Sequence, residues 1–175
     1  MDPFWKTLLV QEFGGAIQML ENAIQACPEA VWSDDSKAPA WTDNDVPGFW
    51  YVVYHTLYFL DYYSSPNHAA FHPPAPFNLD ELDPAGILPA TPYTKDELGQ
   101  YLNYCRARCL AAIEELSEEN AREHCGWERF AMSRAELVIH SLRHVQHHAG
   151  QLHLLLRQRT ASAPRWVSQA SLRCR

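Results

Sequence analysis

Several common features are missing from this 175-residue sequence, and each absence excludes a class of protein. No stretch contains the roughly 18 unbroken apolar residues that a membrane-spanning helix needs, so no membrane partner is expected. The first residues lack the basic-then-apolar layout of a signal peptide. The five cysteines form no C-x-x-C pair, and an odd number without an export signal predicts reduced thiols in the cytoplasm.

Motifs of several enzyme classes are missing as well. The sequence has no H-E-x-x-H, which zincin proteases require, and no glycine-rich loop that would hold a phosphate. The paired E-x-x-H motifs of ferritin-like di-iron bundles are absent, which argues against a dinuclear carboxylate site. The net charge of −7 argues against nucleic acid as the main partner.

The sequence is rich in apolar residues with helical spacing. Apolar residues make up 47% of the chain and six residues are Trp, which is a globular composition. Helical periodicity covers four ranges, which are Pro3–Ala26, Pro47–Tyr63, Thr94–Leu116 and Ser133–Arg157. The last two ranges begin with Thr94-x-x-Glu97 and Ser133-x-x-Glu136, which have the form of capping boxes. No strand pattern competes strongly, so the sequence predicts an all-α fold, a four-helix bundle in one domain.

A long, proline-rich connection from Pro66 to Tyr93 joins the second and third predicted helices. A connection of this length inside a compact domain is usually functional or a crossover. In a four-helix bundle it allows two successive helices to run parallel instead of forming a hairpin. We expect residues 1–159 to form the bundle and residues 160–175 to form a loosely ordered tail, from which Trp166 and Val167 could dock on the bundle.

Three histidines fall within five positions of the fourth predicted helix, in the stretch H-V-Q-H-H that runs from His144 to His148. Because His144 and His148 are four residues apart, they lie one turn apart on the same face of a helix. On a helical wheel His148 falls inside the apolar arc and His144 at its edge, whereas the other histidines of this helix, His140, His147 and His153, fall outside it. Two imidazoles with this spacing can hold one metal ion.

A stable metal site needs three protein ligands or more, and the second predicted helix offers His55 as the third. This helix is apolar nearly all round, which predicts that it is buried. A lone histidine there must be hydrogen-bonded, paired or metal-bound, because an unsatisfied polar group would cost about 1–3 kcal/mol. Tyr51, Tyr58 and Tyr62 fall in the same arc, which predicts a tyrosine-lined cleft leading to the site.

The histidine of the second helix, followed by H-x-x-H-H-x-G-Q near the end of the fourth, resembles the DinB superfamily of metalloenzymes. The resemblance covers nearly the whole chain and implies a bundle of up-down-down-up type, often a homodimer. It also implies, by position, that His55, His144 and His148 bind one divalent metal ion. Members of known activity are similar to thiol S-transferases and a thiol-dependent isomerase, which act with low-molecular-weight thiols such as bacillithiol or mycothiol.

Three neutral imidazoles on one divalent ion leave a position for water or substrate, which is the layout of a catalytic site. All-nitrogen ligation favours zinc or nickel over iron or manganese. Next to the histidines, we expect Gly150 to serve close helix packing and Gln151 to make a polar contact near the site. The predicted function is a metal-dependent enzyme that activates a thiol or water and acts on a small molecule. Two alternatives stay open: a non-catalytic, stress-linked metal or small-molecule binding protein, and a helical interaction module with structural histidines.

Overall fold

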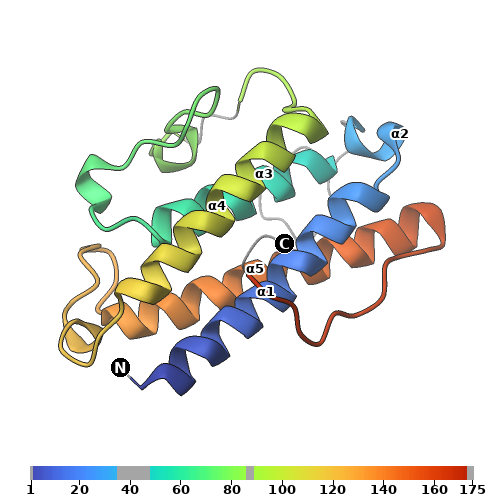
Figure 1. Cartoon of the computed structure of the whole chain (residues 1–175). Coiled ribbons are helices and arrows are strands. Elements are labelled where there is room, and N and C mark those ends of the chain that lie inside the picture. Colours follow the sequence, from blue (N-terminus) through green and yellow to red (C-terminus); the bar gives the residue numbers. More distant parts are fainter. Residues whose placement is uncertain (1, 35–47, 86–88, 173–175) are drawn as a thin grey trace.

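The computed structural model describes residues 2–34, 48–85 and 89–172 (Figure 1). Its helices are α1 (Pro3–Ala26), α2 (Glu29–Trp32), α3 (Gly48–Tyr63), α4 (Lys95–Glu115) and α5 (Arg134–Thr160). Three short 3-10 turns lie between them, η1 (His68–Ala70), η2 (Asp80–Leu82) and η3 (Asn120–Arg122). Within these ranges there is no strand, only an isolated β-bridge between His124 and Ser133. The prediction of an all-α fold is confirmed.

The local sequence explains where the helices begin. The Asp2 carboxylate caps α1 by accepting a hydrogen bond of 2.8 Å from the backbone N–H of Phe4. Capping boxes start α4 and α5, as predicted, in the pairs Thr94/Glu97 and Ser133/Glu136. The four-residue helix α2 was not predicted, because a single turn shows no periodicity. The predicted start of α3 at Pro47 lies outside the described residues.

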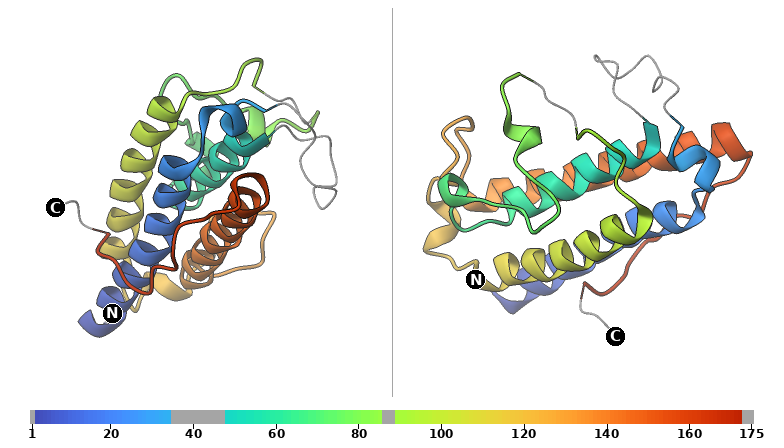
Figure 2. Two further views of the ribbon diagram at one scale, coloured as in Figure 1. Left: turned by 90° about the vertical axis from the view of Figure 1, so that its right-hand side faces the viewer. Right: turned by 90° about the horizontal axis from the view of Figure 1, so that it is seen from above.

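The four long helices form a bundle in which each helix packs on two others. Both α1 and α3 contact α4 and α5. Figures 1 and 2 show that α1 and α5 run in one direction, and that α3 and α4 run in the other. In agreement, Lys6 at the start of α1 donates a hydrogen bond to the backbone oxygen of Glu114 at the end of α4. No helix in the described part of the chain is long and apolar enough to cross a membrane.

A buried acidic group joins α3 to α4. The Asp61 side chain is fully buried, and its carboxylate accepts a hydrogen bond of 3.1 Å from the Tyr101 hydroxyl. Nε of Arg108 lies 3.4 Å from the other carboxylate oxygen and completes the ion pair. Because Asp61 faces α4, its side chain does not reach the histidines of α3 and α5. Its titration affects the pH dependence of the unfolding free energy and not the histidine cluster.

The segment after α5 returns along α1. Ala161 ends α5 with a left-handed φ of 58°, and residues 161–172 then lie against α1 (Figure 2). Leu172 is buried in the core and Val167 packs against it, whereas the Trp166 side chain is 68% exposed. Residues 173–175 lie outside the described ranges, and the division into a bundle of residues 1–159 and a tail stays a prediction.

The C-terminal segment passes very close to the backbone of α1 at Gly14. A Cβ atom added to Gly14 would lie 1.9 Å from the backbone oxygen of Ala170, so Gly14→Ala forces the segment off the helix. We expect a loss of about 1–3 kcal/mol of unfolding free energy, as for other overpacked positions, and faster proteolysis after α5. The matched control is Gly99→Ala in α4, where an added Cβ meets nothing within 4 Å. Urea unfolding should show that this control is unchanged or slightly stabilised. Equal stability of the two variants would contradict the prediction.

Candidate metal centre

The structure brings the three predicted histidines together between α3 and α5. The Nε2 atom of His144 lies 3.3 Å from Nε2 of His55 and 3.1 Å from Nε2 of His148. The ligand atoms of the three residues all lie within 4.8 Å of one another. Among the described residues this is the one group of three or more His, Cys, Asp or Glu side chains that is arranged to hold a metal ion.

The distances from Nε2 of His144 to the other two Nε2 atoms fit a single divalent ion. Nitrogen ligands bound to zinc at 2.0–2.1 Å in tetrahedral geometry stand about 3.3 Å from one another. The two Nε2 separations, 3.1 and 3.3 Å, match that distance. Three histidine nitrogens would occupy three of the four positions of a tetrahedral ion, which leaves the fourth position for a further ligand.

His148 is oriented from its other ring nitrogen by Gln151. Nδ1 of His148 lies 2.7 Å from Oε1 of Gln151, three residues later on α5. An amide oxygen only accepts, so Nδ1 of His148 carries the proton and Nε2 keeps its lone pair. The predicted polar contact of Gln151 is confirmed. The predicted packing role of Gly150 is wrong, because a Cβ atom added there meets nothing within 4 Å and Gly150 lies on the exposed side of α5.

His55 contacts a residue that the sequence did not reveal as part of the site. Nδ1 of His55 lies 2.9 Å from Oε2 of Glu81, in the turn η2 of the long connection. The Glu81 side chain is only 6% exposed. No motif marks Glu81 in the sequence, and only its place in the long connection hinted at a functional role.

Burial keeps His144 and His148 uncharged at neutral pH. Together with the neighbouring imidazoles, it lowers the pKa of His144 to about 2. Burial also lowers the pKa of His148 to about 3, with a further contribution from His55. The Nδ1 atom of His144 is buried and has no hydrogen-bond partner among the described residues. Neutral imidazole is the form that binds a metal ion, so both side chains are ready to act as ligands at neutral pH.

Aromatic rings flank the cluster. The ring of Phe59 lies 4.9 Å from that of His55, and the ring of Tyr51 lies 6.3 Å from it. The ring of Tyr63 lies 5.8 Å from that of His144. Of the three tyrosines that were predicted to line a cleft, only Tyr51 has a ring contact with a histidine of the cluster among the described residues. Tyr58 and Tyr62 are buried and pack against other aromatic rings of the core. The helical wheel placed both tyrosines on the correct face of α3 but could not show which side chains pack against that face.

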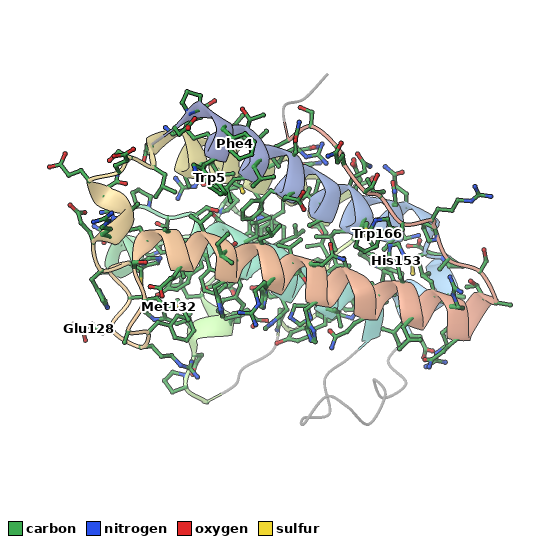
Figure 3. The ribbon with its side chains drawn as sticks, turned by 90° about the horizontal axis from the view of Figure 1, so that it is seen from below. Phe4, Trp5, Glu128, Met132, His153 and Trp166 are labelled. Carbon is green, nitrogen blue, oxygen red and sulfur yellow. The ribbon has the colours of Figure 1, made fainter. Side chains whose placement is uncertain are left out.

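The other histidines of α5 lie outside the cluster, as the wheel predicts. His147 is exposed, although its ring lies 5.0 Å from that of His148. His140 packs against the ring of Tyr63. His153 lies on the side of α5 that faces α1 (Figure 3), where its Nε2 is 3.0 Å from the backbone oxygen of Met19.

Comparison with known proteins identifies one family. A family model of the DinB superfamily matches residues 12–152, a range that contains the three clustered histidines. No curated protein matches the chain, and no solved structure matches it either.

Proposed function

The chain belongs to the DinB superfamily, and we propose that it is an enzyme that uses one divalent metal ion, held by His55, His144 and His148, to activate a thiol or a water. The observation that carries the proposal is the convergence of three Nε2 atoms from two helices at 3.1 and 3.3 Å. A divalent ion bound there would act as a Lewis acid and bring the pKa of a bound thiol or water towards neutrality.

The residues around the site have distinct tasks in this proposal. His55, His144 and His148 hold the ion through Nε2. Their donor set is neutral and all-nitrogen, which favours zinc or nickel. The rings of Phe59 and Tyr63 shield one side from water, and a water-poor site strengthens the attraction between an ion and a bound anion.

The resemblance to thiol-dependent members supports S-transfer as the reaction. A low-molecular-weight thiol such as bacillithiol or mycothiol would lose its proton to solvent. Its sulfur would then form a bond to an electrophilic carbon of a small molecule, and the leaving group would depart with its electron pair. We also propose that the protein is a cytoplasmic homodimer. The cysteines within the described residues are free and buried, which supports a reducing compartment; these are Cys27, Cys105, Cys109 and Cys125.

Metal content tests the proposal directly. Untagged protein purified without chelator should contain about one zinc or nickel ion per chain by elemental analysis. His55→Ala and His148→Ala should lose the metal while keeping their helical circular dichroism. His147→Ala is the matched control, because His147 is exposed and adjacent to the cluster, and it should keep the metal.

Two results would overturn the proposal at different levels. Wild-type protein that takes up no metal, even after reconstitution, would rule out the three-histidine site. Protein that binds metal but transfers no thiol to any of a panel of electrophiles would rule out S-transfer, and would favour the non-catalytic binding protein.

A further inference from the structure

The long connection between α3 and α4 is anchored to the core by aromatic side chains. It returns from the end of α3 to the start of α4 along the outside of the bundle (Figure 1). Phe71 and Phe77 are both buried. The Phe77 ring stacks on Tyr101 of α4 at 4.2 Å and on Tyr54 of α3 at 6.0 Å. Phe77 therefore fixes the connection four residues before Glu81, and η2 is held against α3.

Glu81 is a buried carboxylate with two partners on α3. Its side chain is 6% exposed and lies 2.9 Å from Nδ1 of His55. The Tyr51 hydroxyl donates a hydrogen bond to the same side chain. Burial raises the pKa of Tyr51, and the charge of Glu81 raises it further, so Tyr51 stays a hydrogen-bond donor. A carboxylate is buried at high cost unless it is hydrogen-bonded, and His55 and Tyr51 meet that need.

We propose that Glu81 is the positioning residue of the metal centre, which fixes His55 with its proton on Nδ1 and its Nε2 lone pair directed at His144 and His148. A carboxylate only accepts hydrogen bonds, so its contact with Nδ1 selects this tautomer. The same contact sets the angle of the ring and makes Nε2 a stronger donor to a metal ion. Glu81 thereby couples the long connection to the site.

Charge gives Glu81 a second task. The three ligands are neutral imidazoles, so a divalent ion among them places two positive charges in a half-buried site. Of the two described partners that contact the outer nitrogens of the ligands, Gln151 is neutral and Glu81 is acidic. Glu81 therefore supplies a compensating negative charge, 2.9 Å from a ligand ring. This inference rests on the proposed metal-dependent function, but the tautomer of His55 can be tested without metal.

The first test compares metal affinity across a set of variants, by competition between the protein and a chelator for Zn²⁺ and Co²⁺. Glu81→Ala should weaken binding about 10–100-fold, as expected when a histidine ligand loses its outer partner. Glu81→Gln should lose less, because its amide oxygen can still accept from Nδ1. Asp80→Asn is the matched control, since it removes one negative charge from the same turn without touching His55, and its affinity should stay at the wild-type value.

The second test reads the His55 tautomer by ¹H–¹⁵N NMR of the metal-free protein. Wild type and Glu81→Gln should carry the proton on Nδ1, whereas Glu81→Ala should shift it towards Nε2. Unchanged affinity in Glu81→Ala, or an unchanged tautomer, would overturn the assignment of Glu81. A wild type that binds no metal would refute the proposed function. In that case the tautomer comparison alone would still support or overturn the positioning role.

Discussion

Removal of the metal with a chelator is expected to lower the melting temperature by about 10 °C. A ligand present at a thousand times its dissociation constant stabilises the folded state by about 4 kcal/mol. For a chain of this size, each kcal/mol shifts the melting temperature by about 2–4 °C. The physical reason is that one ion would join α3 to α5 through His55, His144 and His148, ligands that the unfolded chain does not hold together. Without it, Nε2 atoms stand 3.1 and 3.3 Å apart with no cation between them.

Thermal unfolding followed by circular dichroism, in excess zinc and in EDTA, measures the difference. His147→Ala should show the wild-type difference, and His148→Ala should show almost none. If a protein that demonstrably contains one metal ion melts at the same temperature after chelation, the ion does not lie between α3 and α5.

Local signals in the sequence were sufficient for the helices and for half of the site. The side chains of Thr94 and Ser133 act within their own first turn, so their capping boxes could be recognised without tertiary information. The same holds for His144 and His148, because helical geometry alone places residues four apart on one face. His55 required a further step. Its place on an apolar helix marked it as a buried histidine that needs a partner, but its approach to α5 depends on how α3 packs, which the family resemblance indicated.

Features that depend on packing between distant segments could not be predicted. Glu81 reaches His55 because Phe77 anchors an irregular connection, and no periodicity describes such a path. No local pattern distinguishes Gly14 within its helix, because its constraint comes from the C-terminal segment that crosses it. Gly150 was predicted to serve close helix packing but meets no neighbour, because proximity to the histidines in sequence does not decide which helix face is covered. In each case the missing information was which distant segment, if any, packs against the residue.

Acidification of the metal-free protein from about pH 7.5 to about pH 5.5 is expected to lower the free energy of unfolding by about 2 kcal/mol. His144 and His148 have pKa values lowered to about 2 and about 3, chiefly by burial, so both stay neutral in the folded protein over this range. In the unfolded chain a histidine takes up a proton near pH 6.5. The unfolded state therefore binds more protons as the pH falls, and each of the two histidines removes about 1.4 kcal/mol of stability.

Asp61 opposes this loss. Burial raises its pKa from 3.8 to about 6, against the lowering effects of Arg108 and Tyr101. The folded protein therefore takes up a proton on Asp61 in the same range, while the unfolded chain does not. This uptake returns about 0.8 kcal/mol of stability as the pH falls, which leaves the net loss of about 2 kcal/mol.

Urea unfolding in EDTA at the two pH values separates the contributions. His148→Gln should lose about 1.4 kcal/mol less than wild type between them, because one neutral histidine is gone. Asp61→Asn should lose about 3 kcal/mol, because the opposing proton uptake is removed. Burial also lowers the pKa of His68 and His140, so these two act in the same direction as the site histidines and cannot reverse the sign. A stability that rises on acidification would mean that the histidines take up protons in the folded state. The cluster would then be too open to keep neutral ligands ready for a metal ion.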